Sequence, residues 1–444
     1  MNRDPVDVNA IGSAVLFENG RIIDPRNQID RVGRVLVTGQ IIAALDPSDA
    51  DLPTACDRID IRNQILAPGL IDLTAEFREP GFEEDETIQS GSDAALAGGY
   101  SSVLVSSSTQ PVVDSAAAVQ LVRQIAGRVQ GVRVYPIACL SKGREADQMS
   151  ELGTLTEAGA VAFSDSPKPM SNDALLKRAL EYCRMLNRPI FDRPEVPELA
   201  RGGVMHDGRV ALTLGLRGLP TEAEDLAVAR DVRLAEATKG WLHVGPISTM
   251  GAIDMIGRVR GRGIEVTAST CPHNLSGDDR LLESYDSCYK VHPPIRSPRH
   301  AQAVRNAIAS GVITVIESGH MPRSLEKKYN DLDLAPFGAA TLETTLGVCA
   351  TELVHHGGLD WPTLIACLSS NPAQVAGIPG GNLEVGSPAD IVVIDPMHEW
   401  RVDPSEFRSH CRSSPFAGRT LTGRPVATMV GGQFKFQLQT ATCV

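Results

Sequence analysis

The sequence predicts an α/β protein, a (β/α)8 TIM barrel with a small β-sandwich domain built from both chain ends. Short strands broken by turns occupy both ends of the chain, and strand–helix units repeat over about 300 residues between them. The length of 444 residues allows one large core and a smaller one. We expect residues 1–66 and 380–444 to form the split β domain and residues 67–379 to form the barrel.

Composition and charge limit the partners that the chain can have. A net charge of −12 disfavours nucleic acid and anionic membranes, because both repel an acidic surface. No apolar run reaches the ~18 residues that a membrane span needs. Residues 1–7 carry acids and a proline, unlike a secretory signal. The nine cysteines are scattered, which favours reduced thiols and a cytoplasmic location.

The N-terminal region has the pattern of a small antiparallel β unit. Residues 14–17 are the first expected strand, and Asn19-Gly20 is the turn expected to end it. Residues 32–37 and 41–45 are expected to be further strands, with a turn at Gly39.

The middle of the chain alternates short β-rich runs with longer helical stretches. Strands are expected at 101–105, 132–137, 160–163, 189–191, 241–244, 264–267 and 312–316, and helices at 115–129, 172–186, 222–238 and 249–261. Strands return at 390–395 and 427–436, before a tail of about eight residues that we expect to be loose.

Framework motifs follow one another in a fixed order along the chain. They are Ala67-Pro68-Gly69-Leu70-Ile71-Asp72, Phe77-Arg78-Glu79-Pro80-Gly81, and the segments 97–100, 157–165, 292–296, 371–373 and 386–391. With these motifs the chain resembles the dihydroorotases of the amidohydrolase superfamily, in particular the class found beside aspartate carbamoyltransferase in bacteria. In active members of that family a metal-bound hydroxide attacks the ring amide, and an aspartate moves the proton.

The resemblance assigns the family's metal ligands to positions where this chain has other residues. The His-x-His pair falls on Thr74 and Glu76. The metal-binding acid falls on Ser166, and two further histidines fall on Arg193 and Pro246. The proton-shuttling aspartate falls on Gly319. We therefore expect no catalytic residue, no metal and no cofactor.

The family's substrate-binding positions are only partly kept. Arg78, which grips the substrate carboxylate in the family, is present, and His320 matches a family histidine. Ser108 and His292 replace asparagines, and Arg323 replaces a histidine. Arg78 has two open roles: it can still bind an anion, or it can pair with Glu76 or Glu79.

A relocated metal site, holding zinc, is the alternative. Its candidate ligands at the barrel mouth are Glu76, Asp165, His243, Glu317 and His320. Arg193 projects into the same space and would repel a divalent cation, so we expect it to pair with Glu76 or Asp165 instead. His243 is more simply a core histidine, and His320 a residue that caps a loop. Residues 325–330 are expected to form a solvated loop.

The resemblance implies a dihydroorotase-like protein of pyrimidine biosynthesis that has lost its metal centre. Such an inactive homologue would serve as a structural partner of the aspartate carbamoyltransferase catalytic chain, and we expect it to form a homo-oligomer. Two alternatives stay open: an active cyclic-amide hydrolase of the dihydroorotase type, with a relocated metal or none, and a sensor that binds an anion through Arg78, Arg193 and Arg323.

Overall fold

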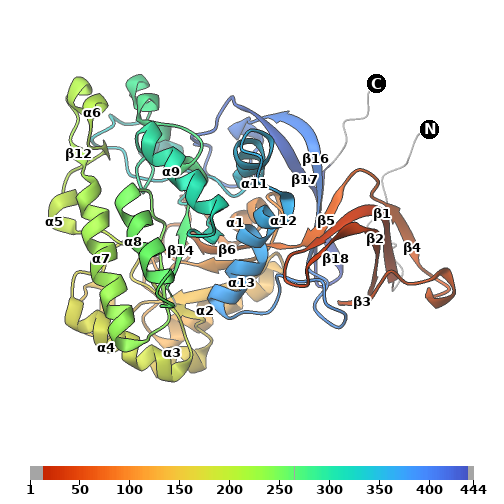
Figure 1. Cartoon of the computed structure of the whole chain (residues 1–444). Coiled ribbons are helices and arrows are strands. Elements are labelled where there is room, and N and C mark those ends of the chain that lie inside the picture. The colour runs from red at the N-terminus through yellow and green to blue at the C-terminus, as the bar shows by residue number, and fades with distance from the viewer. Residues whose placement is uncertain (1–13, 265, 439–444) are drawn as a thin grey trace.

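The structure, a computed structural model, describes residues 14–264 and 266–438. It has two parts, a barrel surrounded by helices and a β domain beside it (Figure 1). The segment 1–7, most of the predicted C-terminal tail and residue 265 lie outside the described residues. No helix in the described part of the chain is long and apolar enough to cross a membrane.

The barrel is a sheet of eight parallel strands in the order β15-β14-β13-β10-β9-β8-β7-β6. The strands are β6 (Leu70–Ala75), β7 (Tyr100–Val105), β8 (Arg133–Ala138), β9 (Ala162–Phe163), β10 (Ile190–Asp192), β13 (Leu242–Val244), β14 (Val266–Thr270) and β15 (Val315–Ile316). Hydrogen bonds between the segments that carry β6 and β15 connect the two edges: Glu76 N donates to His320 O (3.0 Å) and Ser318 N to Asp72 Oδ1 (2.8 Å). The predicted (β/α)8 barrel is confirmed.

Helices alternate with these strands and cover the outside of the barrel. Side chains of Ser115, Asn172 and Thr249 accept hydrogen bonds from the first turns of three of them, as N-caps do. The helices around the barrel are α1 (Ile88–Ala97), α2 (Ala116–Val129), α3 (Leu152–Ala158), α4 (Asp173–Leu186), α7 (Thr221–Thr238), α8 (Met250–Arg260), α9 (Pro298–Ala309), α11 (Thr345–Cys349), α12 (Trp361–Ile365) and α13 (Asn371–Ala376).

An inserted segment between β10 and α7 lies at the carboxyl end of the barrel strands. It contains α5 (Pro197–Ala200), β11 (Met205–His206), α6 (Arg209–Leu214) and β12 (Gly218–Leu219). Its apolar residues pack with Leu282, Val291 and Leu332 in a small core of their own. This segment forms one wall of the pocket described below.

The β domain contains strands from both chain ends in one connected sheet. The strands are β1 (Ala14–Asp24), β2 (Ile29–Thr38), β3 (Ile41–Leu45), β4 (Asp57–Asp60), β5 (Ile65–Pro68), β16 (Ile391–Arg401), β17 (Thr420–Val430) and β18 (Gln433–Gln437). β5 pairs with β1 on one side and with β16 on the other, and thereby joins the two ends. The sheet continues to Pro68, slightly beyond the boundary that we expected at residue 66.

Two local predictions are wrong. No turn forms at Asn19-Gly20, because β1 continues from Ala14 to Asp24 and contains these residues in a β-bulge, with Asn19 at φ 66°.

Residues 325–330 are not simply a solvated loop. They begin with the short helix α10 (Leu325–Lys328), and Lys328 is buried, with Nζ 3.2 Å from Pro336 O.

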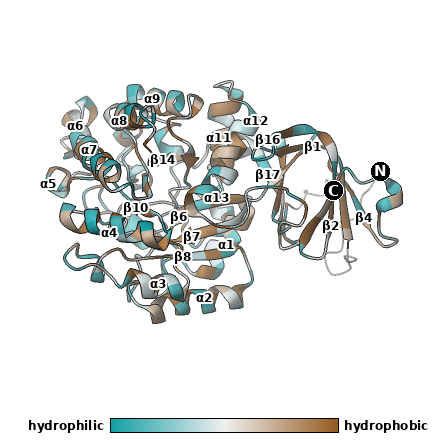
Figure 2. Cartoon of the chain, turned by 60° about the horizontal axis from the view of Figure 1, so that its bottom comes forward, coloured by the Kyte–Doolittle hydropathy of each residue, from teal (hydrophilic) through white to brown (hydrophobic). Residues whose placement is uncertain are grey.

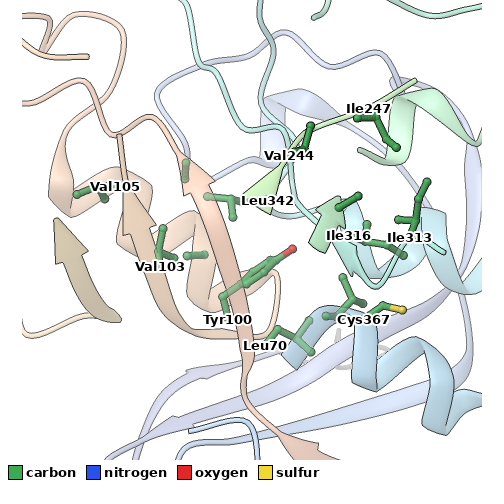
Figure 3. Close-up of a cluster of buried hydrophobic side chains, with 14 of the residues drawn as sticks. Leu70, Tyr100, Val103, Val105, Val244, Ile247, Ile313, Ile316, Leu342 and Cys367 are labelled. Carbon is green, nitrogen blue, oxygen red and sulfur yellow. The ribbon is translucent and has the colours of Figure 1, made fainter. Parts of the chain in front are cut away.

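The main hydrophobic core joins the barrel strands to the surrounding helices. Figure 3 shows side chains of β6, β7, β13 and β15 converging with Leu342 and Cys367 around Tyr100. Hydrophobic residues are concentrated on the strands, whereas the helices carry both kinds of residue (Figure 2). Cys183, Cys349 and Cys367 are buried in this core, as expected for plain apolar residues.

Candidate functional site

The carboxyl ends of the barrel strands bring most of the predicted site residues to one rim. Thr74 lies in β6, and Glu76 follows this strand. Arg193 directly follows β10, and Glu317 directly follows β15. Parallel strands in a barrel end at the same face, which is where enzymes of this fold place their chemistry.

Glu317 is the centre of a hydrogen-bonded network inside the barrel. Its carboxylate accepts hydrogen bonds from the hydroxyls of Thr74 and Ser269. The Nε2 of His243 lies 3.3 Å from the same carboxylate, and the Nδ1 of His243 is 2.9 Å from Thr267 Oγ1. Burial alone would raise the pKa of Glu317, but the bonds from His243, Ser269 and Thr74 outweigh it and lower that pKa. His243 is therefore a core histidine with both nitrogens engaged.

Glu76 and Arg78 form a buried ion pair at the rim. This contact corresponds to one of the two roles expected for Arg78. The expected pairing of Arg193 with Glu76 or Asp165 is wrong, because Arg193 makes no ion pair with any residue that the structure describes. Burial lowers the pKa of Arg193, while Glu195 and Glu76 oppose that shift from a distance.

The carboxylate of Asp165 is hydrogen-bonded to the loop that follows β8. It accepts hydrogen bonds from Leu140 N (2.9 Å), Ser141 N (3.0 Å) and the Ser141 hydroxyl. Burial raises the pKa of Asp165, although these hydrogen bonds oppose the shift. Ser166 is held through its backbone, where its carbonyl accepts from Ser106 Oγ at 3.2 Å.

Two predicted substrate-binding positions, Ser108 and Arg323, are hydrogen-bonded to other protein groups. Arg144 Nη1 donates to Ser108 Oγ at 3.1 Å. Arg323 donates from Nε to Phe337 O (3.1 Å), and its Nη1 lies 3.5 Å from Asp85 Oδ2. The side chains of Ser108 and Arg323 thus contact other protein groups.

The two histidines of this set lie on different sides of the rim. His292 Nε2 lies 2.7 Å from Glu195 Oε2, and burial lowers the pKa of His292 to about 4. His320 accepts from Thr341 N at 3.2 Å, and its Nε2 is 3.4 Å from Glu86. His320 thus caps a loop, as expected.

Gly319 has a left-handed backbone and little space for a side chain. Its φ of +67° lies in the left-handed region, and a Cβ added there would be 2.8 Å from Cys271 Sγ and 3.1 Å from His273 Cε1. Pro246 contributes only to the wall of a pocket beside Arg193. Neither position offers a group that could move a proton or bind a metal.

The side chains present do not fit a divalent metal. Over residues 14–264 and 266–438, no three His, Cys, Asp or Glu side chains converge as a metal site requires. The five acids and histidines expected at a relocated site lie in four separate places. Glu76 pairs with Arg78, Asp165 accepts hydrogen bonds from the β8 loop, and His243 lies with Glu317 in the interior. His320 faces Glu86 instead.

Several residues of the rim were missed by the sequence reasoning. Glu195 and Arg296 line the pocket that contains Arg193 and Pro246. Glu86, fully buried, accepts hydrogen bonds from Ser90 and Ser409. Glu195 could have been found, because it follows Arg193 by two residues just after a strand. The partners of Glu86 come from distant parts of the chain and leave no local pattern.

Comparison with known proteins agrees with this fold. The chain is similar to a protein from Rhodopirellula baltica named "Putative dihydroorotase", with 66% identity over 95% of this chain and 93% of that protein. It is similar to a dihydroorotase from Pelotomaculum thermopropionicum, with 41% identity over 95% of this chain and 98% of that protein.

A solved structure and a family description complete the comparison. The L-hydantoinase (dihydropyrimidinase) from Arthrobacter aurescens superposes with a TM-score of 0.86 at 23% identity, covering 95% of this chain and 96% of that one. At that identity the likeness concerns the fold alone. The family described as "Dihydro-orotase-like" matches residues 63–251. From its barrel, its ordered framework motifs and its identity to curated relatives, the chain belongs to the dihydroorotase family of the amidohydrolase superfamily.

Proposed function

We propose that this chain is a dihydroorotase relative that no longer hydrolyses cyclic amides at a metal centre, and that it acts as a structural partner of aspartate carbamoyltransferase in pyrimidine biosynthesis. The observation that carries the loss of activity is Arg193. A guanidinium with only 5% of its surface exposed stands where the family places an imidazole ligand. It is charged at every physiological pH, and it opposes a divalent cation.

The remaining acids support the same proposal. Glu76 is paired with Arg78, and the carboxylate of Glu317 accepts hydrogen bonds from the hydroxyls of Thr74 and Ser269. Gly319 supplies no acid for proton transfer. A hydrolytic reaction at this rim would need both a polarised water and a group to carry its proton.

The partner is proposed from the class of dihydroorotase that the chain resembles. A chain that keeps the framework of this family but loses its chemistry is suited to a role in assembly. We propose that it is cytoplasmic and forms a homo-oligomer. The eight cysteines within the described ranges are all free thiols, which supports a reducing compartment.

One observation favours an active enzyme instead. The chain is 41% identical over nearly its full length to a protein named as a dihydroorotase. The alternative is a cyclic-amide hydrolase of the dihydroorotase type with zinc at a relocated site. It requires Arg193 to leave the rim.

Zinc analysis and a turnover assay on one preparation test the loss of activity. We expect well under one zinc per chain and no conversion of dihydroorotate or carbamoyl aspartate above a protein-free blank, with or without added zinc. Stoichiometric zinc together with turnover that a chelator abolishes would overturn the proposal.

Co-expression tests the partner. Tagged chain should co-purify with the aspartate carbamoyltransferase of the same organism, elute with it in one size-exclusion peak, and raise its activity. The partner proposal fails if the two proteins elute separately at micromolar concentration and the transcarbamoylase activity is the same with and without this chain.

A further inference from the structure

A cleft lies between the β domain and the barrel. The helices α12 and α13 are on the side of the barrel that faces the β domain (Figure 1). Two cavities, of about 380 Å³ and about 500 Å³, lie between these helices and the connection of β1 with β2. Pro25, Ala366 and Asn371 line both cavities, so the two adjoin. Ile313 and Thr314, which precede β15, place the cleft at the amino end of the barrel strands, opposite to the rim.

The cavity of about 380 Å³ has a mainly apolar lining. Ile29 contributes to it from the β domain, and Ile308 and Pro362 contribute from the barrel side. Sites that hold small molecules have volumes of ~300–1,000 Å³, are lined mainly by apolar side chains and are common between domains. The cleft has these three properties.

Hydrogen bonds within the chain fix both walls of the cleft. On the β-domain side, the buried carboxylate of Asp24 accepts from Asn27 N (3.3 Å), Asn27 Nδ2 (2.7 Å) and Leu383 N (2.7 Å). On the barrel side, Asn371 Nδ2 donates to Thr314 O at 2.8 Å. The walls are therefore held in place without a ligand, as is usual for small-molecule sites.

One positive charge in the cleft has no counter-charge within the described chain. The charged residue that lines the larger cavity is Arg26, which is exposed. Its guanidinium makes no hydrogen bond or ion pair with residues 14–264 and 266–438. The charged residue of the smaller cavity is Asp30, and both of its oxygens are held by Arg21, at 2.7 and 2.9 Å. A ligand in the cleft therefore meets an apolar cavity beside one unpaired cation.

We propose that the cleft binds an amphipathic carboxylate, with its apolar body in the cavity lined by Ile29, Ile308 and Pro362 and its carboxylate at Arg26. Burial of the apolar body supplies most of the affinity, because an exposed ion pair contributes little. The site lies at the other end of the barrel from Arg193. It does not depend on the loss of hydrolysis or on transcarbamoylase binding, so each proposal can fail alone.

Calorimetric titration of the full chain with hexanoate, octanoate and decanoate tests the apolar part of the site. Each carboxylate should bind at one site per chain, and the affinity should rise about fourfold for each added methylene. The absence of decanoate binding, or an affinity that does not change with chain length, would overturn the proposal.

A comparison of decanoate with decyltrimethylammonium tests the charge. The two ligands share their apolar chain, and the net charge of −12 favours the cation over most of the protein surface. Arg26 should reverse this preference locally, so decanoate should bind about threefold more tightly at low ionic strength. Equal or tighter binding of decyltrimethylammonium would refute a carboxylate site.

Two variants separate the contributions of charge and volume. Arg26→Gln should abolish the preference for decanoate, whereas Arg201→Gln, at an exposed arginine of the inserted segment, should leave it unchanged. Ala366→Phe places a larger side chain between the two cavities and should weaken decanoate binding at least about tenfold. An unchanged affinity in Ala366→Phe would contradict the location of the site.

A crystal of the unmodified chain soaked in decanoate covers the case in which Ala366→Phe does not fold. Decanoate should lie between Ile29 and Pro362, with its carboxylate within hydrogen-bond distance of Arg26. A cleft that contains water only, or decanoate bound only elsewhere, would refute the site.

Discussion

The interior of the barrel and the rim at its carboxyl end differ in how their buried charged side chains are paired. Inside, the carboxylate of Glu317 is met by Thr74, Ser269 and His243. At the rim, Nε and Nη2 of Arg193 have no acceptor among residues 14–264 and 266–438. A buried charged side chain can thus be surrounded by groups that hydrogen-bond to it, or it can keep donors without a partner in the described chain. The first arrangement stabilises the fold, and the second costs free energy.

Removal of the interior carboxylate should have the largest effect. Glu317→Ala leaves three buried donors unpaired, so we expect the free energy of unfolding to fall by about 3–5 kcal/mol. Urea unfolding of the variant and the wild type measures the difference. Glu145→Gln, which removes an exposed acid paired with Lys168, is the matched control and should change stability far less. A loss in Glu317→Ala no larger than that of the control would remove the distinction between the two regions.

The rim should respond to acid through His292. In the folded chain the pKa of His292 is lowered from 6.5 to about 4. Between pH 6.5 and pH 4, His292 is therefore protonated in the unfolded chain but mostly neutral in the folded chain. The contribution of His292 to stability is therefore present above pH 6.5 and is lost as the pH falls to 4, by about 3 kcal/mol. The difference in unfolding free energy between wild type and His292→Gln should shrink across this range.

Exposed His356→Gln provides the control for the acid dependence. Its side chain is 68% exposed, so this variant reports the effect of replacing a histidine at the surface. A difference for His292→Gln that changes with pH no more than that for His356→Gln would show that His292 is not held neutral beside Arg193.

Restoring the family aspartate should damage the rim rather than repair it. Gly319→Asp combines a left-handed backbone with a Cβ too close to Cys271, so we expect a loss of about 1–3 kcal/mol and no dihydroorotate turnover. Gly39→Asp is the control. Gly39 has a similar φ of +59° but open space around an added Cβ, so this variant measures the loss of stability that comes from the backbone conformation alone. Equal melting temperatures for the two variants would show that the contact with Cys271 is unimportant.

Loss of one interior donor should have the smallest effect. Thr74→Val keeps the shape of the side chain and removes one hydroxyl from Glu317, which should cost about 1 kcal/mol. Thermal unfolding detects the change. A variant as stable as wild type would mean that Ser269 and His243 satisfy the carboxylate without Thr74.

The parts of the fold that depend on local pattern could be predicted from the sequence. Helices such as α2 and α4 have apolar periodicity and capping residues, and their predicted ranges agree closely with the structure. The Asn19-Gly20 turn could not be recognised as a bulge. Gly20 lies against Ile61, which follows β4 and whose side chain would be 2.4 Å from a Cβ at Gly20. Such a contact between distant segments leaves no local pattern.

The substituted positions of the site could be named, but their pairing could not. Motif spacing identifies Arg193 and Arg78 as rim residues. Which of them meets Glu76 depends on side-chain directions after two different strands, β6 and β10. The network around Glu317 joins residues from four strand segments, and only the closed barrel brings them together.

The pairing of β5 with β16 has a consequence for synthesis of the protein. β5 ends at Pro68 and its neighbour β16 begins at Ile391. At ~5–20 residues per second, the ribosome needs on the order of 16–65 s to make the chain between them. Throughout that interval one side of β5 lacks its strand partner, which makes this edge a place where nascent chains can associate wrongly and where a chaperone would be of use.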